Sequence, residues 1–365
     1  MKKIVMFVYG DITTDARVQR AASTLSASYE VILISNNWGK EVQNTSYKNV
    51  LVGRDGYDSR NYFNTIREVL RIVKQEKPFI FYGHDYYSAL AIRFLLGRKY
   101  CKKIVYDAHE LYVPQPGLHF TVRSRFFYAI EKSIVKKVDL LICASRERAE
   151  KMQQHYGLNE PPIAIRNISQ LRISHDETTE KIMRSLDLFF SKPGITVVYA
   201  GVVIGSRRID ELASIVSKHP EKYKLLIVGK GDALDRVKHI ADSVPALTSA
   251  FTGAVPYRSL GAILSRSDIG FIYYPVNTLN NIYCASNKLY EYASVNLPIL
   301  ANENPTIKKE LELGQMGVAI NDLETGLEKI SANIEQYKEA CSFFTANNRW
   351  EDESKILVKA IMEIN

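Results

Sequence analysis

The sequence predicts an α/β protein with two doubly wound parallel-sheet domains that face a cleft. Three observations indicate this fold class. The chain has 365 residues, which is more than one hydrophobic core usually serves. Short apolar runs alternate with helical patterns in both halves, as in parallel sheets covered by helices on both faces. A polar stretch over Leu171–Gly194 interrupts this alternation, so we expect a hinge there and place the domains at residues 1–170 and 171–349.

The first domain begins with an apolar run directly after Lys3, which predicts a strand rather than a signal peptide. The predicted strands of this domain are Lys3–Tyr9, Glu30–Ser35, Phe79–Tyr82, Lys103–Tyr106, Leu140–Ala144 and Ile163–Arg166. The predicted helices are Ala16–Ser26, Tyr62–Gln75, Tyr86–Leu96, Arg123–Val138 and Arg146–His155. Ligands of such sheets bind at the carboxyl ends of the strands, so the loops that follow the strands are where a site is expected.

A second alternation of strands and helices follows Gly194. Its predicted strands are Ile195–Tyr199, Lys224–Val228, Leu247–Thr252, Ile269–Tyr273 and Ile299–Ala301. Its predicted helices are Arg208–Lys218, Ala233–Asp242, Tyr257–Arg266, Asn287–Ser294 and Thr306–Leu313. A last amphipathic helix is expected over Trp350–Ile364.

The composition is that of an ordinary globular protein, with 46% hydrophobic and 24% charged residues. No apolar run is long enough for a membrane-spanning helix. The four cysteines are widely spaced and predict neither a zinc site nor a disulfide framework. A reducing, cytoplasmic environment fits this pattern best.

The net charge of +8 is unevenly distributed. Residues 1–165 hold 25 Lys and Arg against 16 Asp and Glu, or +9, whereas the remainder holds 23 against 24, or −1. The basic residues concentrate in segments 93–103 and 123–137, among bulky apolar residues. This pattern favours either attachment to an anionic membrane surface or an ordinary solvated helix face, and both interpretations stay open. Because no nucleic-acid-binding motif accompanies the charge, we expect no nucleic acid partner.

The heptapeptide Ser286–Tyr292 has the composition of an anion-binding helix start. Ser286 is a good N-cap, and the amides of a helix that begins near Asn287 would point at a bound phosphate, with Lys288 adding a positive charge. Glu291 lies one turn further on, within reach of ribose or sugar hydroxyls. An ordinary amphipathic helix with a capped start is the alternative explanation.

Two loops of the second domain carry glycine and basic residues directly after strands. Gly201 leads to Arg207 at the start of a helix, and Gly229-Lys230 follows the next strand. Glycine permits close approach of the backbone to a ligand, and arginine suits bidentate contacts with phosphate. The spacing is not that of a P-loop, and no G-x-G-x-x-G follows the first strand, so dinucleotide-dependent redox chemistry is disfavoured.

Histidines and carboxylates follow two strands of the first domain. Asp107, His109 and Glu110 end one strand, and His84-Asp85 ends the strand before it. The set invites a metal site, but its loose spacing is not that of zinc ligands. We therefore expect hydrogen-bonding roles and no metal, with a buried structural histidine as the alternative for either position.

Taken in order, these residues resemble the family 4 glycosyltransferases. The resemblance rests on segments that share their order with the family and run from Val5 to about Glu312. They are Tyr106–Leu111, Ile142–Ser145, Asn167, Gly201 with Arg207, and Asn287–Tyr292 with Leu297-Pro298. The chain is similar in particular to the branch with an N-K-L-[FY]-E-Y motif, which often serves surface polysaccharide assembly. The resemblance implies the GT-B fold of two Rossmann-like domains, with the helix over residues 350–365 returning to the first.

The resemblance also implies a retaining, metal-independent transferase that needs no cofactor. It would move a sugar from a nucleotide-diphosphate sugar of the UDP or GDP type to a hydroxyl of a lipid-linked or oligosaccharide acceptor, as in capsule synthesis. The first domain would bind the acceptor and the second domain the donor. A cytoplasmic location is expected, and peripheral attachment to the inner face of the membrane stays open.

Functional residues of the family can be carried to matching positions. As catalytic residues, the resemblance implies His109 facing the donor sugar, Arg207 at the leaving diphosphate, and Glu291 at the ribose hydroxyls. The predicted donor-binding residues are Gly10, Asp11, Gly201, Arg207, Gly229, Lys230, Tyr283, Asn287, Lys288, Leu289 and Glu291. Asp15, Arg17 and Val18 match a D-x-R-V element with an orienting role. The chain departs from the family at Tyr283, where a glutamate is usual, and at Val202, where many members carry an arginine.

Two other classes of protein stay open. A sugar-nucleotide epimerase shares the architecture but would need paired catalytic carboxylates, which Tyr283 does not supply. A non-catalytic GT-B partner protein of a polysaccharide-assembly complex would keep the fold and lose site residues, whereas His109, Arg207, Lys288 and Glu291 are all present. Donor binding without turnover would identify this second class.

Overall fold

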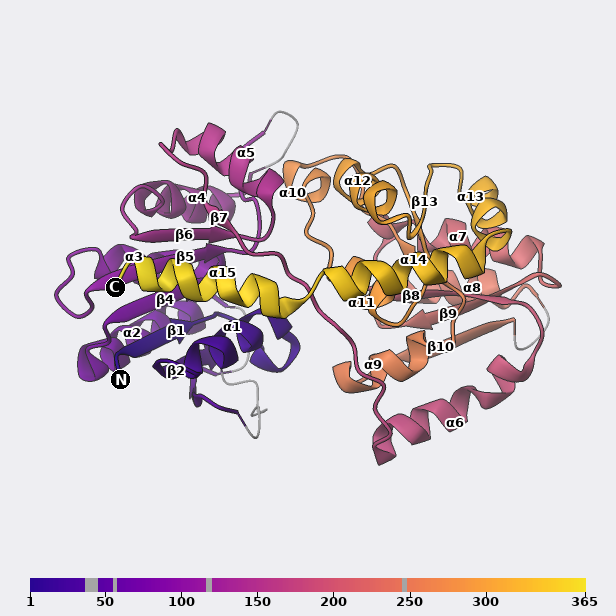
Figure 1. Cartoon of the computed structure of the whole chain (residues 1–365), viewed down its shortest axis with the longest axis horizontal. Helices are drawn as coiled ribbons and strands as arrows, with labels where there is room; N and C mark the ends of the chain where they lie inside the picture. The colour runs from indigo at the N-terminus through magenta and orange to yellow at the C-terminus, as the bar shows by residue number, and fades with distance from the viewer. Residues whose placement is uncertain (37–44, 55–57, 116–119, 245–247) are drawn as a thin grey trace. The chain divides into compact units, whose positions relative to one another are not determined.

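The computed structural model describes residues 1–36, 45–54, 58–115, 120–244 and 248–365 (Figure 1). The chain divides into two compact units. Unit 1 comprises Met1–Asn167 together with Trp350–Asn365, and unit 2 comprises Ile168–Arg349. The C-terminal helix therefore belongs to the same unit as the N-terminus.

Unit 1 is built on a seven-stranded parallel sheet with the order β3-β2-β1-β4-β5-β6-β7. Its strands are β1 Lys3–Phe7, β2 Glu30–Asn36, β3 Lys48–Val52, β4 Ile80–His84, β5 Lys103–Ala108, β6 Leu140–Cys143 and β7 Ile163–Ala164. Its helices are η1 Ile12–Thr14, α1 Ala16–Ser26, α2 Ser59–Glu76, α3 Asp85–Leu95, α4 Val122–Ile134, α5 Arg146–Tyr156 and α15 Trp350–Glu363. The step from β1 to β2 runs in one direction along the sheet and the steps from β3 to β6 run in the other. Right-handed crossovers therefore place α1 on one face and α2, α3 and α4 on the opposite face.

Helix α15 packs against α1 in the hydrophobic core of unit 1. Leu25 of α1 and Leu357 of α15 are buried in the same cluster. The Trp350 indole donates a hydrogen bond to Thr24 Oγ1 at 3.0 Å, and the Arg20 guanidinium lies 5.2 Å from the centre of the indole ring. These contacts explain why the last helix belongs to unit 1 although most of the chain separates it from α1.

Unit 2 contains a six-stranded parallel sheet with the order β10-β9-β8-β11-β12-β13. Its strands are β8 Ile195–Ala200, β9 Tyr223–Val228, β10 Ser249–Gly253, β11 Ile269–Ile272, β12 Ile299–Ala301 and β13 Gly317–Ala319. Its helices are α6 Glu177–Ser191, η2 Gly205–Arg207, α7 Ile209–Lys218, α8 Leu234–Ala241, α9 Tyr257–Leu264, α10 Leu279–Ile282, α11 Asn287–Ser294, α12 Pro305–Gly314, α13 Leu323–Ser331 and α14 Ile334–Asn347. Two parallel-sheet α/β units confirm the predicted fold class.

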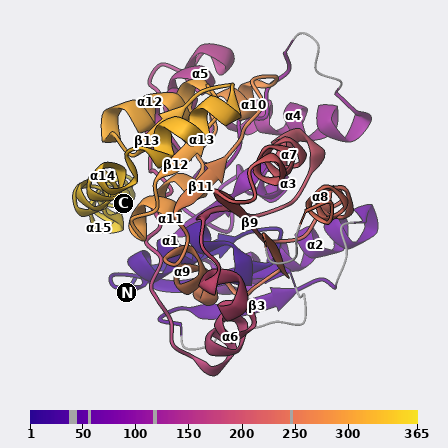
Figure 2. The ribbon, with the colours of Figure 1, turned by 90° about the vertical axis from the view of Figure 1, so that its right-hand side faces the viewer.

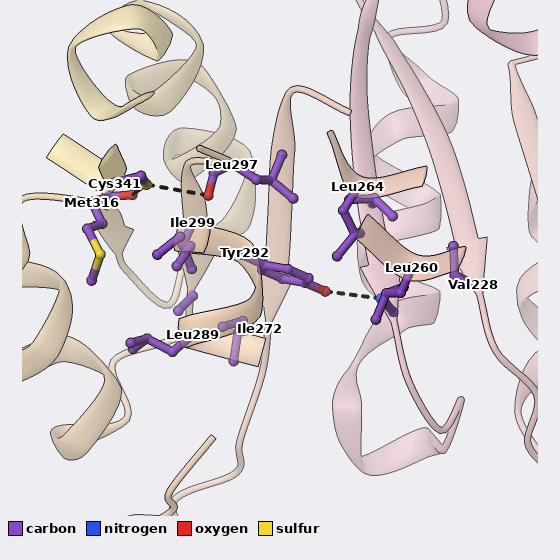
Figure 3. Close-up of a cluster of buried hydrophobic side chains, with 14 of the residues drawn as sticks. Val228, Leu260, Leu264, Ile272, Leu289, Tyr292, Leu297, Ile299, Met316 and Cys341 are labelled. Carbon is purple, nitrogen blue, oxygen red and sulfur yellow. Dashed lines mark hydrogen bonds between the residues drawn. The ribbon is translucent and has the colours of Figure 1, made fainter. Parts of the chain in front are cut away.

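Tyr292 ties α11 to the sheet of unit 2 (Figure 3). Its ring is fully buried, and its hydroxyl accepts a hydrogen bond from the Ala200 amide at 3.0 Å. Gly270 of β11 makes room for the ring, because a Cβ at that position would lie 2.4 Å from it. Leu289, one turn earlier in α11, is buried in the same cluster. Since α11 follows β11 in the chain and precedes β12, its first turn lies at the carboxyl edge of the sheet.

The structure corrects several sequence-based assignments. The segment Leu171–Gly194, expected to be a hinge, contains α6, whose buried Leu186 and Phe189 belong to the core of unit 2. Helix α6 packs against α9 (Figures 1 and 2). The sequence does not predict the edge strand β3 or the short β13. Leu247, the first residue of one predicted strand, lies outside the described residues, and β10 begins at Ser249.

In the described part of the chain, no helix combines the length and apolarity that crossing a bilayer requires.

Candidate active site

Arg17 and Asp107 form a buried ion pair at the carboxyl edge of the unit 1 sheet. Arg17 lies in the first turn of α1 and Asp107 in β5, and they are 4% and 1% exposed. The guanidinium donates to both carboxylate oxygens, at 2.8 and 3.3 Å, and to the Ile165 carbonyl at 2.7 Å. Burial alone would raise the pKa of Asp107, but Arg17 and His84 outweigh it and hold that pKa well below its usual range. The pair therefore joins α1, β5 and the segment after β7 through an ionised, bidentate contact.

Two histidines meet beside this ion pair. His84 ends β4 and His109 follows β5, and Nδ1 of His84 lies 3.2 Å from Nε2 of His109. Oδ2 of Asp107 lies 3.5 Å from His84 Nδ1 and 3.8 Å from His109 Nε2. The ring of Tyr82 stacks on His84, and its hydroxyl donates to Asp107 at 3.1 Å. The His84 side chain is fully buried and that of His109 is 17% exposed, so His109 is the imidazole of this pair that can reach a ligand.

His109 is uncharged at neutral pH. Burial, the largest influence, lowers the pKa of His109 to about 4 against the opposing effect of Asp107. A neutral imidazole keeps both a donor and an acceptor nitrogen, and it can therefore bind a hydroxyl group without carrying a positive charge.

His84, Asp107 and His109 are described residues that could together hold a metal ion, because their ligand atoms lie within 4.8 Å of one another. A cation placed there would lie beside Arg17, whose Nε is 3.3 Å from the same carboxylate oxygen. The low pKa of His109 reflects surroundings that disfavour a positive charge. These residues fit a hydrogen-bond network better than a divalent cation, and the expectation of no metal stays a prediction.

The loop after β1 holds Gly10 and Asp11. Asp11 caps η1, where its Oδ1 accepts hydrogen bonds from the amide and the hydroxyl of Thr13 at 2.9 and 2.6 Å. A Cβ at Gly10 would meet no described atom within 4 Å. The predicted loop residues therefore have a defined backbone with space beside Gly10.

Asp85 is half-buried and has a strained backbone at the junction of β4 and α3. Its φ of 57° lies in the left-handed region, and burial raises the pKa of its carboxyl well above the usual value. Its Oδ1 is buried without a hydrogen-bond partner in the described part of the chain. Such combinations cluster at functional sites, so Asp85 joins the candidates of unit 1.

In unit 2, glycines let the loops after β8 and β9 lie against each other. A Cβ at Gly229, where φ is 149°, would lie 1.9 Å from the Gly201 carbonyl oxygen. The Gly201 amide donates a hydrogen bond to the Val228 carbonyl at 2.8 Å, and the Val203 amide donates one to the Lys230 carbonyl at 3.1 Å. The sequence predicts that Gly201 and Gly229 bring backbone close to a ligand, and in the structure they also bring the two loops close to each other.

Arg207 is held in place by backbone and by an aromatic ring. Its NH1 donates to the Tyr273 carbonyl at 2.8 Å, and its Cζ lies 3.9 Å from the centre of the Tyr274 ring. Asn302 in turn clamps the backbone of Tyr274, accepting from its amide at 3.0 Å and donating to its carbonyl at 2.9 Å. The stacking and the clamp orient the guanidinium, which is half-buried at the carboxyl edge of the sheet.

Lys288 lies in the first turn of α11. A Cβ at Gly201 would lie 2.9 Å from Lys288 Nζ, so the glycine leaves room for the ammonium group. Burial lowers the pKa of Lys288, but Tyr274, Tyr199 and Glu291 outweigh it and raise that pKa above its ordinary value. Burial raises the pKa of Tyr199, and the charges of Lys288 and Arg207 both oppose that rise, as expected when two cations lie near one hydroxyl. Lys288 is therefore a charged group close to Arg207.

Ser286 is the N-cap residue of α11, as the sequence predicts, but its hydroxyl makes no capping hydrogen bond. The hydroxyl oxygen is instead buried without a partner in the described residues. A buried hydroxyl and helix-start amides that lack a side-chain cap are donors suited to an anion.

Glu291 lies one turn along α11, 7% exposed, and its Oε1 accepts a hydrogen bond from the Tyr257 hydroxyl at 3.1 Å. The other predicted donor-binding residues of unit 2 differ in exposure. Asn287 and Lys230 are exposed, and Tyr283 is half-buried at the end of α10. Leu289 is 2% exposed in the core of unit 2, so its side chain faces away from any ligand at this edge.

The candidate site includes residues that no local pattern in the sequence singles out. Tyr199 and Tyr274 surround the two cations, Tyr257 binds Glu291, and Asn302 clamps Tyr274. Tyr199 lies near the end of β8, and Tyr274 follows β11 by two residues. Because ligands bind at the carboxyl ends of strands in this fold class, these positions could have indicated both tyrosines from the sequence.

Residues 16–167 match the family described as Glycosyltransferase Family 4. This match covers most of unit 1 and less than half of the chain. No curated protein sequence matches the chain.

Solved structures match the chain over 97% or more of its length. Sucrose-phosphate synthase from Thermosynechococcus elongatus has 14% identity and a TM-score of 0.76, with 100% of this chain and 99% of that chain covered. HepE from Anabaena in complex with UDP and glucose has 12% identity and a TM-score of 0.74, with 100% of both chains covered. WaaG, a glycosyltransferase involved in lipopolysaccharide biosynthesis, has 14% identity and a TM-score of 0.68, with 97% of this chain and 99% of that chain covered. The chain thus has the GT-B fold, and its first unit carries a Glycosyltransferase Family 4 match.

Proposed function

We propose that the chain is a retaining, metal-independent glycosyltransferase. It transfers a sugar from a nucleotide-diphosphate sugar to a hydroxyl of a lipid-linked saccharide in surface polysaccharide synthesis. The base of the donor is uracil or guanine. The family match in unit 1 and the GT-B fold support the reaction class. The structural similarity to HepE in complex with UDP and glucose supports a UDP-sugar donor, and the similarity to WaaG, which is involved in lipopolysaccharide biosynthesis, supports a role in polysaccharide assembly.

The observation that carries the proposal is the set of anion-binding groups at the carboxyl edge of the unit 2 sheet. Arg207 follows strand β8, and Lys288 lies in the first turn of α11, which follows strand β11. The two strands are adjacent in the sheet. The unpartnered Ser286 hydroxyl adds a buried donor to the same helix start. A diphosphate carries the negative charge and the acceptor oxygens that two cations and helix-start amides would bind. In this proposal unit 2 binds the donor and unit 1 the acceptor.

The chemistry assigned to these groups is stabilisation of the leaving diphosphate. As the bond from the anomeric carbon to the diphosphate breaks, negative charge grows on the phosphate oxygens, and Arg207 and Lys288 stabilise it. The departing phosphate accepts the proton of the acceptor hydroxyl that attacks on the same face. His109, neutral at physiological pH, is assigned a hydrogen bond to the transferred sugar.

The proposal is tested by incubating the protein with UDP-sugars and GDP-sugars and a lipid-linked saccharide in the presence of a chelator. Transfer from an α-linked donor should give an α-linked product, as read by the anomeric coupling in NMR. An inverted product would overturn the retaining mechanism, and activity that is abolished by the chelator would overturn metal independence. Nucleotide binding without any transfer would favour the non-catalytic alternative.

Replacing Glu291 with alanine should weaken nucleotide binding by about tenfold or more. The carboxylate is assigned to the ribose hydroxyls, and a hydrogen bond to a charged group contributes about 1.5–3 kcal/mol. Isothermal titration calorimetry with UDP and GDP measures the change in Kd. Tyr257→Phe is the matched control, because it removes the 3.1 Å hydrogen bond to Glu291 and keeps the carboxylate. An unchanged Kd in Glu291→Ala, or an equal loss in the control, would contradict the ribose assignment.

A further inference from the structure

The face of unit 1 covered by α2, α3 and α4 exposes cations and large apolar side chains together. Four large hydrophobic residues are exposed on these helices: Phe63 by 48%, Phe94 by 64%, Val122 by 87% and Phe126 by 42%. The exposed cations of the same helices are Arg60, Arg67, Arg71, Lys74, Arg93, Arg123, Arg125 and Lys132. We call this set of twelve residues the docking face.

The acidic residues of the three helices are directed away from this face. Glu68 accepts a hydrogen bond from the Gly53 amide, and Glu76 binds Lys3. Glu131 of α4 is buried, where it accepts hydrogen bonds from Tyr106 and Tyr156 at 2.6 Å each. Asp85, the remaining acid, is half-buried at the start of α3. No acidic residue within these helices is exposed in the described part of the chain. The exposed Asp58 precedes α2 and caps its first turn, so the eight exposed cations of the docking face still give it a strong positive excess.

Exposed aromatic rings from two helices meet on this face. The ring centres of Phe63 in α2 and Phe126 in α4 lie 6.5 Å apart, and Phe126 lies beside the buried Phe127 at 5.3 Å. Val122 is in the first turn of the same helix α4. Phe63 and Phe126 thus form one apolar cluster rather than isolated exposed residues. Val122 lies one turn before Phe126 on the same side of α4, and Arg123 and Arg125 lie between them in the sequence.

The apolar cluster lies toward the edge of the sheet that carries the site residues of unit 1. Helices α2 and α4 follow β3 and β5, so they begin at the carboxyl edge, and Phe63 and Phe126 are the fifth residues of their helices. Asp11 and His109 follow β1 and β5 and lie at the same edge. A surface that received this face would therefore come close to the site residues of unit 1.

We propose that the docking face binds the surface of an anionic lipid bilayer, with Phe63, Val122 and Phe126 inserted among the acyl chains and the cations at the headgroups. Charge complementarity selects a negative surface, and exposed phenylalanines favour a bilayer over a nucleic acid. The docking rests on the proposed function in that it would present a membrane-embedded acceptor to unit 1. Binding to vesicles itself requires neither donor nor catalysis.

The test is flotation of the full chain with vesicles of phosphatidylcholine, with and without phosphatidylglycerol, at low and high salt. The protein should float with anionic vesicles at low salt, and binding should weaken as salt rises. Each cation near an anionic surface strengthens binding roughly fivefold, so the double variant Arg125→Glu with Lys132→Glu should bind about thirtyfold or more weakly. The double variant Phe63→Ser with Phe126→Ser should also bind more weakly.

Matched controls change similar residues outside the docking face. Lys355→Glu with Lys359→Glu alters two exposed lysines of α15, and Phe343→Ser alters a phenylalanine of α14 that is 73% exposed. Both controls should float like the wild type, and all variants should keep its thermal stability and nucleotide affinity. The docking face would be overturned if the wild type did not float at low salt, or if the controls lost as much binding as the variants of the face. It would also be overturned if duplex DNA displaced the protein from vesicles while the Phe63→Ser with Phe126→Ser variant floated like the wild type. Absence of nucleotide binding by the wild type would instead overturn the proposed function.

Discussion

Arg207→Ala is expected to lower kcat by about a hundredfold to a thousandfold, which is the usual cost of removing one preorganised group that stabilises developing negative charge. Arg207 is positioned before the reaction, by its hydrogen bond to the Tyr273 carbonyl at 2.8 Å and by the Tyr274 ring at 3.9 Å. A group held in this way loses little freedom when the diphosphate leaves. Arg207→Lys should recover part of kcat, because lysine keeps the charge and loses the stacked, planar donor.

Arg208 is the matched control for this substitution. It is the next residue in the chain, it is exposed, and its guanidinium pairs with Glu211 rather than with the Tyr273 carbonyl. Arg208→Ala should leave kcat within about threefold of the wild type, since exposed ion pairs contribute little. Steady-state kinetics with the donor identified by transfer measures both variants. Equal losses in the two variants, or a change confined to KM in Arg207→Ala, would contradict the assignment.

Arg17→Ala is expected to destabilise unit 1 by about 3–5 kcal/mol, because it leaves the Asp107 carboxylate buried and unpaired. The ion pair is 4% and 1% exposed, and Arg17 also binds the Ile165 carbonyl. Arg146→Ala is the control, since its carboxylate partner Glu150 is bound at 3.1 Å on the surface of the same unit. The control should cost less than about 1 kcal/mol. Urea denaturation measures both, and similar midpoints would show that the buried pair contributes no more than a surface pair.

The stability of unit 1 should fall as pH decreases from about 6.5 to about 4. Burial lowers the pKa of His109 from 6.5 to about 4. As pH falls, His109 is therefore protonated in the unfolded chain before it is protonated in the folded chain, and the free energy of unfolding decreases. A shift of this size is on the order of 3 kcal/mol. The pKa of Asp107 is also lowered, so its contribution is complete above 3.8 and is lost only as pH falls through its lower folded value. His109→Gln should flatten the profile between pH 6.5 and 4, and an unchanged profile would contradict the neutral, buried imidazole.

Elements with a strong apolar pattern are those that the sequence predicts well. Strands β1 and β9 are buried along almost their whole length, and each contains a run of four apolar residues, Ile4–Phe7 and Leu225–Val228. Strand β3 lies at the edge of its sheet and is largely half-buried, which leaves a mixed sequence that resembles a loop. Helix α6 fully buries only Thr179, Leu186 and Phe189, and its Leu188 is 71% exposed. Its apolar residues therefore do not mark one buried face, and Leu171–Gly194 reads as a hinge.

The candidate site shows the same division between local and distant information. The helix start at Ser286–Lys288 can be predicted because capping and charge are local properties of the sequence. The partnership of Arg17 with Asp107 joins residues 90 positions apart, and it depends on a strand order that the sequence does not specify. The unpartnered Ser286 hydroxyl is likewise a property of packing, since the same sequence pattern would also suit a conventional cap.

The most direct test of the central claim is calorimetric titration of the wild-type protein with UDP, GDP and ADP in the presence of a chelator, repeated with Mg²⁺. The anion-binding groups around Lys288 and Arg207 predict micromolar binding of UDP or GDP that does not require the metal. Absence of binding by every nucleotide, or binding that appears only with Mg²⁺, would contradict a metal-independent nucleotide-sugar site in unit 2.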